Sequence, residues 1–322
     1  MRVLGAAEIR ALAPMPRLIE ALREAFRDPP ESAVRQVAPI PGGKGDRVLL
    51  YMPAFDRAGG GAIKLVTIFP DNGDRGLPTI QAALVVFSDT GAPVAVLDGA
   101  MVTRLRTGAA SALASSYLSR TDSEHLVIVG TGALAPYMAL GHCAVRPIRR
   151  ITVSGRHEER ARQTAAEIRS LVGDEIEINI ATSLEKVAPI ADIISCATSS
   201  VQPVLVGKWL RPGTFVDLVG GFSPDKRETD DDAIARSRLF VDTYEGALAE
   251  AGDLLQPLQR GLIARDRIEG ELSDLVSGRA TGRRGADEII LFKSVGTAIE
   301  DLCAAKLIVA AAGEQDPVGS GR

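Results

Sequence analysis

The segment that most constrains this chain of 322 residues is a run of apolar residues followed at once by a glycine-rich loop. Residues 126–129 read Leu-Val-Ile-Val, and residues 130–135 read Gly-Thr-Gly-Ala-Leu-Ala. The first run is typical of a buried β-strand, and Gly-x-Gly-x-x-Ala directly after a strand is the fingerprint of a dinucleotide-binding turn. Gly130 allows the tight turn, Gly132 lets the backbone approach a pyrophosphate, and Ala135 lets the next helix pack close to the strand. The pattern predicts a dinucleotide site; the alternative is a glycine turn that binds no ligand.

The helix that follows this turn is expected over residues 133–145, where its first N–H groups would point at the phosphates. The residues predicted to contact the cofactor in the turn are Gly130, Thr131, Gly132, Ala133 and Leu134. A second segment of small residues, 195–199, follows a strand that begins at residue 191 and either leaves room for a ligand or forms an ordinary loop. Outside the turn, the candidate cofactor contacts are Thr79, Thr198, Val219 and Ser294.

The type of nucleotide is indicated by the end of the next strand, which is expected over residues 151–153. A site for NAD usually carries Asp or Glu about 20 residues after the glycines, where it binds the ribose 2′-hydroxyl. Here the strand is followed by Ser154, Gly155 and Arg156, and Arg160 lies one helical turn further on. Since an arginine pairs with a 2′-phosphate that a carboxylate would repel, we expect NADPH, with NADH as the other possibility. The alternative is that Arg156 is only a solvated surface charge.

Composition excludes several other classes of protein. The formal net charge is −4 and no basic run stands out, so nucleic acid is not an expected partner. No apolar run reaches the roughly 18 residues of a membrane span and the N-terminus lacks a signal-peptide pattern, so we expect no membrane partner and a cytoplasmic location. The cysteines and histidines are scattered and predict neither a disulfide framework nor a metal site: Cys143, Cys196, Cys303, His125, His142 and His157. We expect the three thiols to be buried as small hydrophobic groups.

The two halves of the chain carry different patterns. In the first half short turns join apolar runs, which is typical of an antiparallel sheet, with strands expected over residues 48–52, 62–69, 79–87 and 93–97. After residue 126 strands alternate with helices, which predicts a parallel, doubly wound sheet with strands over residues 126–129, 151–153, 176–180, 191–195 and 214–219. Helices are expected over residues 6–27 (interrupted by prolines), 101–118 and 158–171, in segments from residue 231, and in a final strand-and-helix run over 291–312. Residues 70–74 are expected to form a loop, and the tail 313–322 is expected to fray.

An ordered set of short motifs spans nearly the whole chain. Before the glycine turn come a lysine inside a strand, then Gly-Leu-Pro, Asp-Thr-Gly-Ala-Pro, Leu-Asp-Gly and Leu-Arg-Thr at residues 64, 76–78, 89–93, 97–99 and 105–107. Near the end come Leu-Phe-Lys-Ser-Val-Gly and Glu-Asp-Leu-Cys-Ala-Ala-Lys at residues 291–296 and 300–306. From about residue 35 to residue 309 this succession resembles the ornithine cyclodeaminase/mu-crystallin family. The resemblance implies an α/β protein with a Rossmann domain over residues 119–297. It also implies an α+β domain for substrate binding and dimerisation, built from residues 1–118 and 298–322, and hence a homodimer.

The resemblance also implies which residues bind the substrate. In this family an arginine before the first long strand, the strand lysine and the Leu-Arg-Thr arginine gather around a substrate carboxylate, and these correspond to Arg35, Lys64 and Arg106. Arginine offers a planar fork to a carboxylate, and a lysine in an apolar strand is costly unless it has a partner. Desolvation lowers the pKa of such a lysine, so it can act as an acid near neutral pH. The alternatives are that Lys64 extends to solvent, that Arg106 is a structural cation and that Arg35 is a surface charge.

One departure from the family pattern decides between its activities. The cyclodeaminases carry an aspartate directly after the glycines that correspond to Gly220 and Gly221, whereas this chain has Phe222, which can neither take a proton nor pair with an amine. We therefore expect reduction of a small cyclic imine carboxylate, Δ1-pyrroline-2-carboxylate or Δ1-piperideine-2-carboxylate, to L-proline or L-pipecolate, with Lys64 as the catalytic residue. The alternatives are a cyclodeaminase or an alanine-dehydrogenase-like enzyme on the same scaffold, and a non-catalytic NADPH-binding protein similar to mu-crystallin.

Overall fold

The computed structural model describes residues 1–42 and 47–315, which divide into two compact units. One unit comprises Met1–Arg106 and the C-terminal segment from Thr297, and the other comprises Thr107–Gly296. Helix α3 (Gly99–Leu118) runs through the division, so the helix that was expected to link two domains contributes residues to both units. The predicted boundary after residue 118 lies at the end of this helix, whereas the units separate within it.

The first unit is built on a sheet with the strand order β1-β7-β6-β5-β4-β2, and β3 pairs with β4. Its strands are β1 (Arg2–Leu4), β2 (Glu31–Ser32), β3 (Gln36–Pro39), β4 (Val48–Phe55), β5 (Gly61–Ile68), β6 (Ile80–Phe87) and β7 (Pro93–Asp98). The predicted antiparallel pairing is confirmed from β2 to β7, and β1 joins β7 in parallel. The three short strands β1, β2 and β3 were not predicted, because runs of two to four residues carry too little alternation to be recognised.

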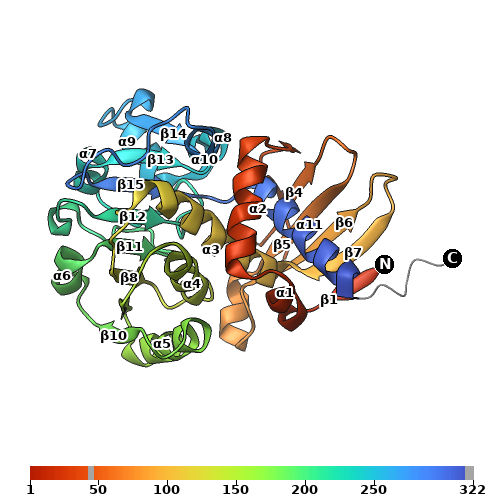
Figure 1. Ribbon diagram of the computed structural model, residues 1–322, viewed down its shortest axis with the longest axis horizontal. Helices are drawn as coiled ribbons and strands as arrows, with labels where there is room; N and C mark the ends of the chain where they lie inside the picture. Colours follow the sequence, from red (N-terminus) through yellow and green to blue (C-terminus); the bar gives the residue numbers. More distant parts are fainter. Residues whose placement is uncertain (43–46, 316–322) are drawn as a thin grey trace. The chain divides into compact units, whose positions relative to one another are not determined.

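Helices cover one face of this sheet. They are α1 (Ala6–Leu12), α2 (Met15–Arg27) and α11 (Ala298–Gln315), and Figure 1 shows α11 crossing the strands β4 to β7, while α2 packs against α11. The expected interruption of the first helical run is confirmed: Pro14 is the N-cap of α2, where the missing N–H of proline is tolerated. Two expectations were wrong. Pro70–Arg75 forms a 3-10 helix rather than a loop, and Gly313 to Gln315 continue α11, while residues 316–322 lie outside the described residues.

The second unit contains an eight-stranded sheet in which every pair is parallel, which confirms the doubly wound prediction. The strand order is β10-β9-β8-β11-β12-β15-β13-β14. The bounds are β8 (His125–Val129), β9 (Arg150–Ser154), β10 (Glu177–Ala181), β11 (Ile193–Cys196), β12 (Phe215–Leu218), β13 (Arg238–Val241), β14 (Ile268–Glu271) and β15 (Ile290–Lys293). Because β8 lies between β9 and β11, the strand order reverses there, and ligands of open parallel sheets bind outside such a reversal.

Helices connect these strands (Figure 1). They are α4 (Ala135–Val145), α5 (Glu158–Val172), α6 (Leu184–Val187), α7 (Asp231–Arg236), α8 (Tyr244–Glu250), α9 (Gly252–Gln259) and α10 (Leu272–Ser277), with 3-10 turns at Ala188–Ile190, Gly207–Trp209 and Arg265–Arg267. The expectation of helical segments from residue 231 onward was incomplete, because β13 and β14 are strands of four residues that lie between short helices. Within the described residues no helix is both long and apolar enough to cross a membrane.

The small residues of α3 allow close packing, as the sequence suggested. A Cβ atom added to Gly141 on α4 would lie 2.3 Å from the carbonyl oxygen of Gly108, so the backbones of α3 and α4 are in direct contact. The three cysteines are free thiols: Cys196 is fully buried, but Cys143 and Cys303 are only partly buried, so the expectation of burial holds completely for one of them.

Candidate functional site

The glycine turn after β8 has the geometry that its sequence predicts. Gly130 has a φ of +116°, which favours glycine, and a Cβ atom there would lie 2.7 Å from the carbonyl oxygen of Ala197. Gly132, by contrast, faces open space, since nothing lies within 4 Å of the position of its missing Cβ. One glycine is therefore required by the turn and by close packing, and the other leaves the backbone accessible to a ligand.

The open space beside this turn is a cavity of about 560 Å³. It lies at the carboxyl ends of the parallel strands, since Val129, Ser154 and Thr182 line it at or just after the ends of β8, β9 and β10. The predicted contacts that line it are Gly130, Thr131, Gly132, Arg156 and Thr198. The lining does not include Ala133, Leu134, Val219 or Ser294, and Thr79 belongs to the first unit. The accessible glycine backbone and the position of the cavity at the strand reversal fit a dinucleotide.

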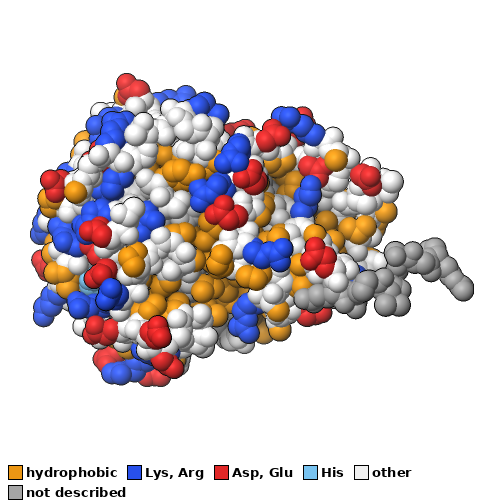
Figure 2. Space-filling model, in the orientation of Figure 1, with side chains coloured by type: hydrophobic (Ala, Val, Ile, Leu, Met, Phe, Trp, Pro, Cys, Tyr) orange, Lys and Arg blue, Asp and Glu red, His pale blue; other side chains and the backbone are white. Residues whose placement is uncertain are grey.

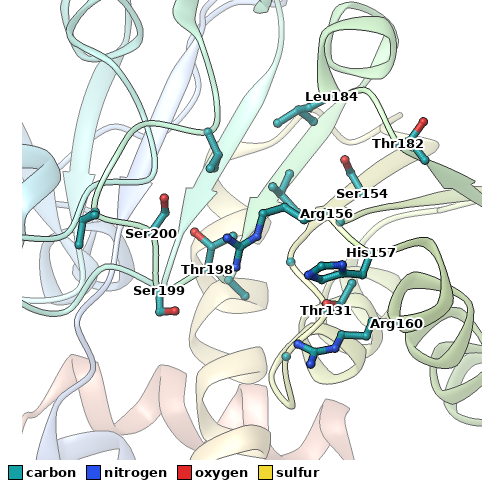
Figure 3. A pocket seen from close by; sticks show the side chains of 17 residues that line it. Thr131, Ser154, Arg156, His157, Arg160, Thr182, Leu184, Thr198, Ser199 and Ser200 are labelled. Atoms are coloured by element: carbon teal, nitrogen blue, oxygen red, sulfur yellow. The ribbon is translucent and has the colours of Figure 1, made fainter. Parts of the chain in front are cut away.

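Basic side chains gather on the β9 side of this cavity. Arg156, His157 and Arg160 line it and are exposed, and Figure 3 shows Arg156 extending in the direction of Thr198 while His157 and Arg160 lie beside Thr131. The acidic residue that usually marks an NAD site at this strand end is absent from the lining. The sequence pointed to the two arginines as cofactor contacts, but His157 was not predicted to line the cavity. Its place directly after Arg156 could have indicated this.

The opposite wall of the cavity is formed by the segment after β11. Ala197, Thr198, Ser199, Ser200 and Val201 all line the cavity, which favours the ligand interpretation of this small-residue segment over an ordinary loop. Val219 and Ser294 lie buried near the ends of β12 and β15 instead of in the cavity, and the Ser294 hydroxyl donates to Asp242 at 3.0 Å.

In the first unit the structure brings Lys64 and Arg106 together around one carboxylate. Lys64, in the middle of β5, is only 2% exposed, and its Nζ lies 2.8 Å from both carboxylate oxygens of Asp301 on α11. Arg106 on α3 donates from Nε to the same carboxylate at 3.1 Å and from Nη1 to Glu300 at 2.6 Å. We refer to Lys64, Arg106, Glu300 and Asp301 as the buried charge cluster. These contacts exclude the alternative that Lys64 extends to solvent.

Arg35 lies at the edge of this cluster. It is half-buried in the segment between β2 and β3, and its charge acts on both Lys64 and Asp301. Counting formal charges, Lys64, Arg106 and Arg35 contribute three positive charges against two negative charges from Glu300 and Asp301. A net positive charge within a buried setting attracts an anion.

The electrostatics of the cluster lower two pKa values. Burial lowers the pKa of Lys64 to about 8, because desolvation and the neighbouring arginines outweigh the attraction of Asp301. Burial alone would raise the pKa of Asp301, but Lys64 and Arg106 lower it below its ordinary value. A lysine with a pKa near 8 is protonated at neutral pH and can still release its proton, which suits a general acid.

Sequence reasoning missed Glu300 and Asp301 as members of this site. The signal was present, since two adjacent acids begin an otherwise apolar helix, but acids in a first helical turn are also ordinary partners of the helix dipole.

Phe222 follows the glycines after β12, as the sequence indicated. Its ring packs against the core of the second unit, and Lys226 Nζ lies 4.4 Å from the ring centroid. Asp225 is exposed and accepts a hydrogen bond from Ser223. Neither residue supplies a buried carboxylate at this position.

The surface shown in Figure 2 carries interspersed basic and acidic side chains without a field of one sign. Over residues 1–42 and 47–315, no group of three or more His, Cys, Asp or Glu side chains is arranged to hold a metal ion.

Comparison with known proteins adds to this geometry. The model of the ornithine cyclodeaminase/mu-crystallin family matches residues 1–316. A Δ1-pyrroline-2-carboxylate reductase of Paracoccus denitrificans is 39% identical over 294 residues, which cover 90% of each chain. The structure of Thermococcus litoralis Δ1-pyrroline-2-carboxylate reductase in complex with NADH and L-proline is 34% identical, covers 100% of both chains and superposes with a TM-score of 0.92. An archaeal alanine dehydrogenase dimer with bound NAD is 28% identical, covers 99% of this chain and 98% of its own, and has a TM-score of 0.88.

Proposed function

The chain belongs to the ornithine cyclodeaminase/mu-crystallin family and is an oxidoreductase of that family, and from this premise we propose that it reduces a cyclic imine carboxylate with NADPH. The substrate is Δ1-pyrroline-2-carboxylate or Δ1-piperideine-2-carboxylate, and the product is L-proline or L-pipecolate. The similarity to reductases named for the first of these substrates supports the proposal.

The observation that carries the proposal is the buried charge cluster, with the Arg35 guanidinium at its edge. Arg106 together with Arg35 offers planar N–H donors to a substrate carboxylate. Burial makes each such hydrogen bond stronger than it would be in water. A protein that only carried a ligand would have no use for an ammonium group with a pKa near 8, so Lys64 argues against the carrier alternative.

The reaction requires one hydride and one proton. NADPH, which the glycine turn at Gly130 and Gly132 would hold, would supply the hydride for the imine carbon. Lys64 donates the proton to the ring nitrogen, so that the C=N bond becomes CH–NH and the lysine is left neutral. Asp301, which lies 2.8 Å from Lys64 Nζ, holds the ammonium group in one position before this transfer.

The preference for NADPH is supported by the basic side of the cavity. Arg156 and Arg160, with His157 between them, offer guanidinium and imidazole donors to a 2′-phosphate. NADH binding remains compatible with the glycine turn, which contacts only the part that the two nucleotides share.

Cyclodeamination of ornithine is disfavoured at Phe222. A cyclodeaminase must pair with the side-chain amine of its substrate, and an aromatic ring packed against the core cannot deprotonate that amine. An apolar wall instead suits a ring without a distal amine. This reasoning does not count against an alanine-dehydrogenase-like reaction, because alanine has no distal amine either.

The assembly that we propose is a homodimer formed through the open face of the first sheet. Ile63, Val85 and Val96 form a cross-strand row on the face opposite Lys64, and Val3 extends this row with an exposed fraction of 73%. The similarity to an alanine dehydrogenase dimer supports a second copy as the partner of this face. Light scattering should give the mass of two chains, and Val85→Glu should give the mass of one; a monomeric unmodified protein would contradict the proposal.

The function is tested by a panel of substrates with NADPH. The panel contains Δ1-pyrroline-2-carboxylate, Δ1-piperideine-2-carboxylate, pyruvate with ammonia, and 2-oxo acids with methylamine. We expect NADPH oxidation to be fastest with one of the two cyclic imines. Faster oxidation with pyruvate and ammonia would support the alanine-dehydrogenase-like alternative instead.

A further inference from the structure

One group of three fully buried ionisable side chains in the second unit has no part in the proposed reaction. They are Glu228, Asp253 and Lys293, each with no exposed surface. Lys293 Nζ lies 3.0 Å from Asp253 Oδ2 and 3.7 Å from Glu228 Oε2, so one cation lies beside two carboxylates. Burying these three charges costs several kcal/mol of desolvation per ion before they pair. The hydrogen bonds of the two carboxylates show what this buried group holds in place.

The Glu228 carboxylate joins the loops that follow two neighbouring strands. Its Oε1 accepts hydrogen bonds from the backbone N–H of Thr198 at 2.7 Å and from the Thr198 hydroxyl at 3.0 Å. Its Oε2 accepts from the N–H groups of Gly220 at 2.7 Å and Gly221 at 3.2 Å. Thr198 follows β11 and the two glycines follow β12, so a single side chain joins the two loops.

Two further contacts make this junction tight. A Cβ atom on Gly220 would lie 1.9 Å from the carbonyl oxygen of Thr198, so only glycine allows the loops to approach so closely. Asp253 Oδ1 accepts from the backbone N–H groups of Glu228 at 2.8 Å and Thr229 at 3.0 Å, which fixes the backbone that carries the Glu228 side chain.

The junction between the two loops lies where the nicotinamide half of a dinucleotide is expected to bind. The pyrophosphate belongs at the glycine turn and the adenosine ribose at the end of β9, beside Arg156. The nicotinamide half then extends to the other side of the strand reversal, toward the ends of β11 and β12, where Thr198 lines the cavity.

We propose that Glu228, held by Lys293 and Asp253, is a positioning residue that fixes the loops after β11 and β12 as the wall for the nicotinamide half of the cofactor. This inference rests on the nicotinamide-nucleotide binding stated under the proposed function. It assigns no step of the chemistry to Glu228, which acts through Thr198 and the Gly220 backbone.

The charge state of Glu228 should make the affinity for the nicotinamide half depend on pH, which a purely structural role would not do. Burial, together with the neighbouring Asp253, raises its pKa to about 7 against the opposing attraction of Lys293. The ionised carboxylate accepts all four hydrogen bonds, whereas a protonated carboxyl group has an O–H that donates instead. We therefore expect the Glu228 carboxylate to hold the wall more firmly above neutral pH than below it.

The test compares two ligands that share the adenine half. NADPH contains both halves, whereas adenosine 2′,5′-bisphosphate contains only the adenine half with its 2′-phosphate and ends in a 5′-phosphate monoester. At pH 8 we expect Glu228→Gln to weaken NADPH binding about tenfold, because its amide NH2 group faces N–H donors, while affinity for adenosine 2′,5′-bisphosphate changes by less than about twofold. Equal weakening for both ligands, or no weakening for NADPH, would overturn the inference.

A matched control is available at the opposite edge of the sheet. Asp192 Oδ2 accepts from the backbone N–H groups of Glu124 and His125, both at 2.9 Å, at the amino ends of β8 and β11. Asp192→Asn should lower thermal stability without changing the ratio of the two affinities. A change in that ratio equal to that of Glu228→Gln would mean that general destabilisation explains the result.

A second measurement uses the unmodified protein and does not depend on the folding of any variant. The ratio of NADPH affinity to the affinity for 2′-phospho-ADP-ribose, which keeps the pyrophosphate and lacks the nicotinamide ring, should fall between about pH 8 and pH 6, as Glu228 takes up a proton. Titration of the 2′-phosphate cancels in this ratio, because both ligands carry it. A ratio that is independent of pH would overturn the inference. Absence of any binding of NADPH or NADH would instead overturn the proposed function itself, and this inference with it.

Discussion

Two groups of basic side chains in this protein differ in how they are held. Lys64 and Arg106 in the first unit are 2% and 5% exposed and lie within 3.1 Å of the Asp301 carboxylate. Arg156 and Arg160 beside the cavity of the second unit are exposed, and neither forms an ion pair with a side chain that the structure describes. Removing one partner of a buried ion pair leaves an uncompensated charge, which is strongly destabilising. The interactions of an exposed charge are screened by water and salt. We therefore expect the first group to control the chemistry and the second group to adjust nucleotide choice.

The largest effect that this comparison predicts is at Lys64. Lys64→Ala should reduce kcat for imine reduction on the order of 10²–10⁴-fold, because the proton donor is lost, and should leave NADPH affinity nearly unchanged. Stopped-flow rates and NADPH fluorescence titration give the two quantities separately. Lys306→Ala is the control, since Lys306 is an exposed lysine on α11 that pairs with Asp56, and should keep full activity.

Replacement by arginine separates two roles of the same lysine. Lys64→Arg keeps the positive charge but removes the acid, because guanidinium stays protonated. If Lys64 only binds the carboxylate, Lys64→Arg should restore much of the kcat that Lys64→Ala loses. If Lys64 is the proton donor, Lys64→Arg should not restore kcat. Near-normal kcat and KM in Lys64→Ala would mean that the reaction takes place elsewhere.

The next effect is the pH dependence of the unmodified enzyme. Since Lys64 must be protonated and its pKa is about 8, kcat/KM for reduction should fall about tenfold per pH unit above that value. Unfolding does not explain this loss. The folded state binds fewer protons than the unfolded chain between pH 8 and the ordinary lysine value of 10.5, so Lys64 increases the free energy of unfolding as pH rises through this window. A flat profile up to pH 10 would contradict the assignment of Lys64 as the acid.

A smaller effect is expected at the exposed group. Arg156→Ala should raise the KM for NADPH about fivefold and leave that for NADH unchanged, because only NADPH carries the 2′-phosphate. The difference should shrink with added salt. Arg162→Ala provides the control, as Arg162 lies on α5 but pairs with Glu158 and does not line the cavity. Equal effects on both nucleotides would show that Arg156 does not bind the 2′-phosphate.

The smallest effect concerns Phe222. L-Ornithine with NAD should release no ammonia above background, and Phe222→Asp should not create that activity, because the surrounding pocket must also accept an amine. Ammonia assays on both proteins check this expectation. Robust NAD-dependent ammonia release by the unmodified protein would overturn the choice of reductase over cyclodeaminase.

The two regions also differ in how far the sequence predicts them. The parallel sheet and the glycine turn follow from local patterns: β8 is an apolar run whose next residue must be glycine, and both features are readable within ten residues. The buried charge cluster is not local, since Lys64 and Asp301 are separated by 237 residues. Lys64 and Arg106 were identified through family motifs, but their acidic partners depend on how α11 packs against β5, which no periodicity reveals. Glu228 was missed for the same reason, because its partners come from the loops after β11 and β12, from β15 and from α9.

Imine reduction by this protein is most directly tested by the identity and amount of its product. Purified protein is incubated with Δ1-pyrroline-2-carboxylate and NADPH, and the mixture is separated by chiral chromatography while NADPH oxidation is followed by absorbance. We expect one L-proline for each NADPH oxidised and no D-proline, with Δ1-piperideine-2-carboxylate giving L-pipecolate in the same way. NADPH oxidation without L-proline or L-pipecolate, or no oxidation with either imine, would contradict this expectation.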